Sequence, residues 1–165
     1  MGLFDIFKRS ESHGETRRAQ PAGKAGQTPD FDKLAERTQQ DKTKESLDAL
    51  WGAVYALEDW YMIAAGEPPN VGPFIGVIED KPFVFVFTEP EKAAEAAKNR
   101  GLVDKNGDPH LLAIPVAGFV KTVETYLEKG IFGVYFNDCK NAFYTPLTDV
   151  KSMFQFHRGG SDKSV

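Results

Sequence analysis

The sequence predicts an α+β fold: a single domain in which a mixed, mostly antiparallel β-sheet of five to six strands packs with about four helices, preceded by a flexible N-terminal arm. The chain has 165 residues, 41% of them hydrophobic, which is the composition of one globular domain. Apolar runs rich in Val, Ile and Phe alternate with turn signals, as in strands. Some runs are separated by single helical patterns and others by short turns, so parallel and antiparallel neighbours are both expected.

The chain divides into an arm, a body and a tail. Residues 9–29 contain no Leu, Ile, Val or aromatic side chain, so little burial can offset the entropy of ordering them. We therefore expect residues 1–29 to be a short amphipathic segment with a flexible linker. Residues 30–156 are expected to form the α+β domain, and residues 157–165 a disordered tail.

Two helices are expected at the start of the body. Residues 30–46 are rich in helix formers, with Asp30 as a candidate N-cap. The next helix, ending near Leu57, places its apolar residues at i, i+3, i+4 and i+7, which is one helix face. These residues are Leu47, Leu50, Trp51 and Val54.

A short strand at residues 60–64 precedes a predicted antiparallel hairpin. Residues 74–78 and 83–87 are β-rich and are separated by a turn composition at residues 79–82. The second of these runs, FVFVF, is apolar at every position. Such a strand belongs in the middle of a sheet that is covered on both faces.

The segment after the hairpin carries a helix start signal. Thr88 and Glu91 have the spacing of a capping box, and Pro90 suits the first turn of a helix. This helix is expected to run to about Arg100 and to be closed by Gly101. The remaining expected elements are strands at residues 111–114, 131–136 and 142–145, a helix after Pro115 that stops at Gly130, and a final helix from Thr148 or Asp149.

The charge distribution argues against a nucleic-acid partner. The net charge is −4 and the isoelectric point is about 5.4, so the whole molecule does not attract phosphate groups. Residues 47–156 carry nine basic and fifteen acidic side chains, whereas residues 1–29 carry five basic and three acidic ones. The arm and the body therefore have opposite sign.

No familiar catalytic, cofactor-binding or metal-binding pattern is present. The glycine-rich nucleotide motifs and the G-x-S-x-G elbow are absent, and His13, His110 and His157 are too far apart for a local metal motif. His110 with Asp104 and Asp108 is better explained by a solvated turn than by a carboxylate–imidazole site. The single cysteine, Cys139, cannot form an intramolecular disulfide, which suits a reducing, cytoplasmic setting, and an incidental thiol is preferred to a reactive one. We therefore expect no catalytic, cofactor or metal residues.

Two groups of residues are candidates for interaction with a partner. Leu3, Phe4, Ile6 and Phe7 would occupy an arc of about 160° on a helix, which is typical of a short amphipathic segment. It could contact a membrane surface weakly, enter the groove of a partner, dock on its own domain, or remain a disordered start. In the body, Trp60 and Tyr61 are candidate aromatic anchors, although core positions are the simpler interpretation.

Three segments carry a resemblance to a known family: GPFIGVIEDKPFVFVFTEPE, LLAIPV and GIFGVYFND. Over residues of about 50–155 the chain resembles the N-terminal domain of the SseB-type family, named for a bacterial enhanced serine sensitivity protein. The resemblance implies a bacterial, cytoplasmic α+β domain. It implies no active-site residues.

Two functions remain open from the sequence. The first is a non-enzymatic protein-interaction or regulatory domain with a protein partner, and the second is a small-ligand sensor or an enzyme whose site is built from residues distant in sequence. The N-terminus lacks a secretory signal pattern, and the longest apolar run, residues 111–120, is shorter than the roughly 20 residues needed to cross a bilayer. The sequence leaves the oligomeric state open.

Overall fold

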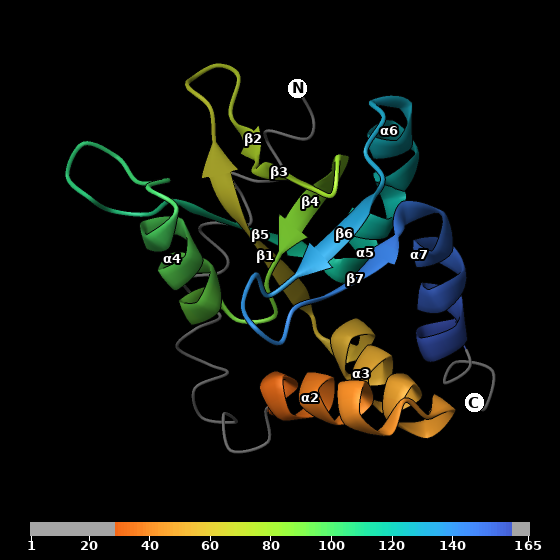
Figure 1. Cartoon of the computed structure of the whole chain (residues 1–165). Helices are drawn as coiled ribbons and strands as arrows, with labels where there is room; N and C mark the ends of the chain where they lie inside the picture. The colour runs from red at the N-terminus through yellow and green to blue at the C-terminus, as the bar shows by residue number, and fades with distance from the viewer. Residues whose placement is uncertain (1–28, 160–165) are drawn as a thin grey trace.

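The computed structural model describes residues 29–159, which form an α+β domain as expected (Figure 1). Its α-helices are α2 (Phe31–Asp41), α3 (Lys44–Ala56), α4 (Pro90–Asn99), α5 (Val116–Lys121), α6 (Val123–Glu128) and α7 (Leu147–Phe154), and a π-helical turn follows at Gln155–Gly159. Its strands are β1 (Asp59–Ala65), β2 (Gly72–Pro73), β3 (Ile75–Ile78), β4 (Lys81–Val86), β5 (Leu111–Pro115), β6 (Gly133–Phe136) and β7 (Phe143–Pro146). The predicted helix that ends at Gly130 is divided in two at Thr122.

The strands form two sheets, whereas the sequence predicted one. Strand order is β2-β1-β5 in the first, which is antiparallel, and β3-β4-β6-β7 in the second, where only β4 and β6 are parallel. The sheets meet where β1 passes the end of β4. There Tyr61 and Phe87 exchange two backbone hydrogen bonds, of 2.9 and 2.7 Å. Helices α3, α5, α6 and α7 pack against one face of the four-stranded sheet.

Helices α2 and α3 form an antiparallel pair, with a break earlier than expected. The Asp30 side chain caps α2 as predicted, accepting from the backbone N–H of Lys33. Lys42 then adopts a left-handed conformation, with φ of +53°, and Thr43 caps α3 through its hydroxyl. A second helix therefore begins at Lys44. Of the four residues predicted to share its packing face, Leu47 is 44% exposed.

The β3–β4 hairpin is tighter than the expected four-residue turn. Glu79 and Asp80 alone connect the strands, both with positive φ, and this is the conformation of a two-residue type I′ turn. Strand β4 is central and buried on both faces, as the FVFVF pattern predicted. Gly76 of β3 lies beneath the Phe85 ring, where a Cβ atom would approach ring carbons to 2.5 Å.

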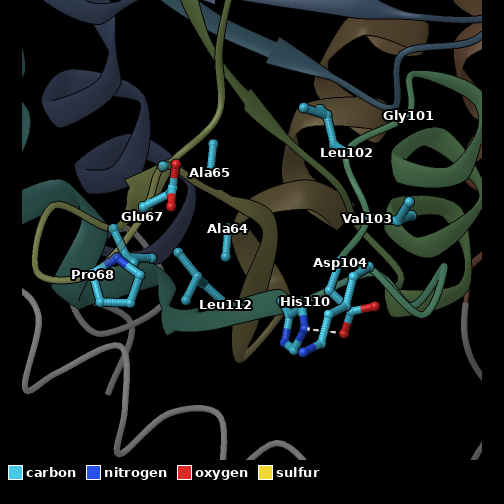
Figure 2. Close-up of a pocket in the computed structure, with 13 residues that line it drawn as sticks. Ala64, Ala65, Glu67, Pro68, Gly101, Leu102, Val103, Asp104, His110 and Leu112 are labelled. Carbon is cyan, nitrogen blue, oxygen red and sulfur yellow. Dashed lines mark hydrogen bonds and ion pairs between the residues drawn. The ribbon is translucent and has the colours of Figure 1, made fainter.

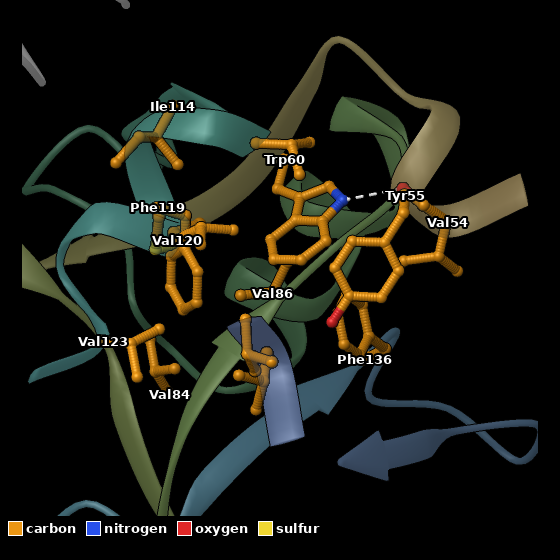
Figure 3. Packing of buried hydrophobic residues seen from close by; sticks show 14 of the residues in the cluster. Val54, Tyr55, Trp60, Val84, Val86, Ile114, Phe119, Val120, Val123 and Phe136 are labelled. Atoms are coloured by element: carbon orange, nitrogen blue, oxygen red, sulfur yellow. Dashed lines mark hydrogen bonds between the residues drawn. The ribbon is translucent and has the colours of Figure 1, made fainter. Parts of the chain in front are cut away.

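The larger core surrounds Trp60 (Figure 3). Its indole N–H donates to the carbonyl oxygen of Val54 at 3.0 Å, so the one polar atom of this buried ring is satisfied. The rings of Tyr55, Phe119 and Phe136 lie with their centroids 5.1 to 5.4 Å from the indole. Trp60 therefore ties α3, β1, α5 and β6 together.

The predicted capping box before α4 is wrong. Glu89 is the N-cap, without a side-chain cap bond. Thr88 is buried and instead forms hydrogen bonds with Asn137, whose side-chain oxygen accepts from the Thr88 backbone N–H at 2.9 Å. The helix ends as predicted, because Gly101 takes a positive φ and the Leu102 N–H donates to the Ala97 carbonyl.

The predicted tail begins too early. The Arg158 guanidinium donates to the carbonyl oxygens of Tyr55 and Leu57, at 2.8 and 2.6 Å, and these are carbonyls at the C-terminal end of α3. His157 stacks on the Tyr55 ring. Residues 157 and 158 therefore belong to the fold. Residues 1–28 and 160–165, with the expected amphipathic segment and linker, lie outside the described residues.

Candidate functional site

A pocket of about 840 Å³ opens beside the end of β1 (Figure 2). One wall is the loop after β1, with Glu67 and Pro68, and the opposite wall is the segment after α4, with Val103 and Asp104. Ala64 lies between the walls, and its small side chain leaves the space open. The lining is mostly apolar, which suits a small molecule with an apolar body.

The polar end of this pocket is a hydrogen-bonded turn. His110 Nε2 lies 2.9 Å from Asp104 Oδ2, and Asp104 Oδ1 accepts from the backbone N–H groups of Asn106 and Asp108. The bonds from the Asp108 backbone and from His110 lower the pKa of the Asp104 carboxyl. This carboxylate is occupied by its own turn, as expected for a structural element, and the His110 side chain is largely exposed. Neither group is placed as a general acid or base in a closed site.

The described residues hold no group of three or more His, Cys, Asp or Glu side chains that could bind a metal ion. Cys139 is exposed, and its Sγ lies 3.9 Å from Asp32 Oδ1. The nearby ammonium of Lys92 is bound to the other oxygen of Asp32 at 2.8 Å. The polar side chain next to the thiol is therefore a carboxylate that is already paired with Lys92.

A second candidate is the face of the four-stranded sheet opposite the larger core. In Figure 1, α5 and α6 lie behind β6 and β7, and no helix covers the front of these strands. Six aromatic rings form what we call the outer aromatic face. They belong to Phe74, Phe83, Phe85, Phe132, Tyr135 and Tyr144.

Helix α4 covers one part of this face, because its Ala93, Ala96 and Ala97 share a buried cluster with Phe83 and Phe85, and the rest is covered by the face's own side chains. The Phe83 ring lies under Phe132, Tyr135 and Tyr144, with centroid distances of 5.4, 6.0 and 5.6 Å. Phe83 is thereby buried, while Tyr144 remains 55% exposed. Each T-shaped ring pair of this kind stabilises a fold by about 0.5–1.5 kcal/mol in addition to the free energy gained from burying the apolar area of the rings. Of the three outer rings, Tyr144 is exposed and available as an interface anchor, whereas Phe132 and Tyr135 are half-buried.

Two cations flank the outer aromatic face. The Lys81 ammonium lies 4.5 Å from the centroid of the Phe132 ring. The Arg100 guanidinium lies 4.9 Å from the Phe85 centroid and forms two hydrogen bonds to Asp138, of 2.6 and 3.0 Å. These contacts give the face a polar rim around an aromatic centre, which is the usual anatomy of a protein interface.

The third candidate is a groove of about 590 Å³ between α3, β7 and α7, which we call the α3–α7 groove. Its apolar lining includes Leu47 and Trp51 of α3 and Phe156 after α7, of which Leu47 and Phe156 are exposed. His157 also lines it, and burial lowers the pKa of this imidazole, which favours the neutral form. Tyr144 borders the groove and also belongs to the outer aromatic face.

The residues predicted as interaction sites have different positions. Leu3, Phe4, Ile6 and Phe7 lie outside the described residues. Trp60 is 0% exposed and makes the core contacts above, so the prediction of an accessible anchor is wrong for this residue. Tyr61 is half-buried where the two sheets meet.

The exposed aromatic residues found instead are Tyr144 and Phe156, and the half-buried Phe132 and Tyr135 adjoin Tyr144 over Phe83. Alternation along a strand indicates that Tyr135 points away from Val134 and Phe136. It does not indicate which face lacks a covering helix, so these residues could not be selected from the sequence.

Comparisons with known proteins assign no family. No protein-family model matches the chain, and no curated protein is significantly similar to it. Within residues 29–159, no helix has the length and apolar character required to span a bilayer.

Proposed function

We propose that this chain is a non-enzymatic protein-interaction or regulatory domain that binds a protein partner through the outer aromatic face. The observation that carries the proposal is the layer that the exposed Tyr144 and the half-buried Phe132 and Tyr135 form over Phe83. Tyrosine rings are frequent binding anchors because they bury a large area while losing little conformational freedom. The acidic body supports a protein rather than a nucleic-acid partner.

Membership of the SseB-like family and a cytoplasmic location are part of the same proposal. Support for the family comes from the hairpin that leads into α4, with its sequence GPFIGVIEDKPFVFVFTEPE, and from the segments LLAIPV and GIFGVYFND. Support for the location comes from the single cysteine, which is exposed.

Affinity capture with the full-length chain tests the interaction. The double variant Tyr135→Ser/Tyr144→Ser removes two anchors, and Val77→Ser is the matched control because Val77 is 69% exposed on β3, at the opposite edge of the sheet from β7. Proteins captured from native lysate by the wild type and the control, and lost with the double variant, would support the proposal. Equal capture by all three chains, with unchanged circular dichroism, would contradict it.

The pocket of Figure 2 supports a second candidate, a small-ligand sensor. Its apolar walls end at the exposed imidazole of His110, which could orient a polar group of a ligand. Phenol and benzoate, one neutral and one anionic, are suitable probes in an NMR titration. Saturable shifts confined to Ala64, Leu102 and Leu112 would favour this function, and no shift there with either probe would count against it.

A further inference from the structure

The α3–α7 groove gathers most of the exposed apolar side chains of the domain. Among residues 29–159, the large hydrophobic residues that are exposed are Leu47, Val77, Tyr144 and Phe156, and all except Val77 border this groove. Trp51, Pro146 and Met153 complete its apolar lining. Large apolar side chains gathered around one hollow, unlike scattered ones, indicate a docking surface.

The charges at the groove are all of one sign. Its lining includes Asp48 and Asp149 but no Lys or Arg. Asp48 forms an ion pair with Lys44 at 3.2 Å, whereas no ion pair within the described part of the chain involves Asp149. A segment with apolar residues followed by basic ones would match both the lining and the rim.

The chain contains such a segment. Residues 3–9 read LFDIFKR, with four large apolar side chains followed by Lys8 and Arg9. Residues 10–28 separate this segment from the folded domain, and a chain of that length, rich in Gly and polar residues, has an r.m.s. span of about 25 Å. A domain of about 130 residues has a radius of gyration of about 14 Å and hence a diameter of about 36 Å. Nineteen residues extend to at most about 65 Å, so the chain length allows the segment to reach the groove.

We propose that residues 3–9 of the chain bind the α3–α7 groove of the same molecule. The apolar side chains contact Leu47, Trp51 and Phe156, and the basic pair faces Asp48 and Asp149. Attachment to the domain gives the segment an effective concentration in the millimolar range, so a contact too weak for a free peptide suffices here. Since Tyr144 borders the groove, the docked segment covers one end of the outer aromatic face. The inference does not depend on the proposed function of that face.

Paramagnetic relaxation in the full-length chain tests the placement. Cys139→Ser removes the natural thiol, and Ser10→Cys carries a nitroxide label next to the segment. The expected result is loss of amide signal intensity at Leu47, Ser152 and Phe156, with no loss at Val77. Equal loss over the whole domain, or loss centred on the Figure 2 pocket, would overturn the proposal.

Further samples distinguish docking within one molecule from docking onto a second copy or binding to a membrane surface. One sample mixes a nitroxide-labelled chain that contains no ¹⁵N with a ¹⁵N-enriched chain that carries no nitroxide. The same pattern of signal loss in this mixture would show docking onto a second copy and would overturn binding within one molecule. Phe4→Ser/Phe7→Ser should abolish the loss at the groove, and Asp48→Asn/Asp149→Asn should reduce it. Cosedimentation of the wild type with vesicles of phosphatidylcholine and phosphatidylglycerol, without any loss at the groove, would assign the segment to a membrane surface and would also overturn the proposal.

Discussion

Replacement of Asn137 isolates the contribution of one buried polar pair. Asn137 and Thr88 are 2% and 3% exposed, and they join the end of β6 to the segment before α4. The Asn137 side-chain oxygen accepts from the Thr88 backbone N–H at 2.9 Å, and its amide nitrogen donates to the Thr88 hydroxyl at 3.1 Å. Asn137 also has a φ of +61°, a conformation that asparagine tolerates better than most residues.

Two substitutions separate the hydrogen bonds from the backbone conformation. Asn137→Gly keeps the positive φ but leaves the buried Thr88 N–H without its partner, which should cost about 1–3 kcal/mol of unfolding free energy. Asn137→Ala loses the same bonds and adds a left-handed strain of about 1–2 kcal/mol, partly offset by about 0.4–1 kcal/mol because alanine has less freedom than glycine in the unfolded chain. We expect the alanine variant to be the less stable of the two, by about 1 kcal/mol.

Guanidinium unfolding at equilibrium, followed by circular dichroism and tryptophan fluorescence, measures both differences. Thr88→Val provides the partner variant, and its effect should combine with that of Asn137→Gly to less than the sum, because both remove the bond between the Asn137 amide and the Thr88 hydroxyl. An Asn137→Gly chain as stable as the wild type would refute the role of the hydrogen bonds. An alanine variant as stable as the glycine variant would refute the role of the backbone conformation.

Three other predictions concern the core. Phe85→Ala should lower the free energy of unfolding by about 3–5 kcal/mol, because the ring is 1% exposed, and an unchanged denaturation midpoint would show that β4 is peripheral. Gly133→Ala should be strongly destabilising because its Cβ would lie 2.5 Å from the Thr145 carbonyl oxygen, whereas Gly118→Ala within α5 should be neutral or gain up to about 1 kcal/mol; equal thermal midpoints for the two variants would contradict this. Burial raises the pKa of Tyr55 and raises that of Tyr126 to about 12, so stability is complete below the unfolded tyrosine pKa of about 10 and should fall as pH rises above it. Tyrosinate absorbance should show these two rings ionising only when the chain unfolds.

The sequence determined the local features of the fold. The unbroken apolar run in β4 predicted burial on both faces, because no side of such a strand is suited to water. Asp30 and Gly101 marked helix ends correctly, since a cap depends on groups within a few residues of one another.

Long-range contacts were decided only by the tertiary structure. Thr88 has the spacing of a capping residue, yet its partner is Asn137, which is 49 residues away. Arg158 was assigned to a tail because its binding groups, the carbonyls at the end of α3, are more than 100 residues distant.

The candidate surfaces depend on the tertiary structure in the same way. Hydrophobic periodicity shows which side chains share a face of a helix or strand, but exposure depends on which other elements pack there. Trp60 and Tyr144 are both aromatic residues in strands, and the first lies in the centre of the core while the second is more than half exposed. The rings that complete the burial of Trp60, Phe119 and Phe136, come from distant parts of the chain, so only the assembled fold distinguishes the two residues.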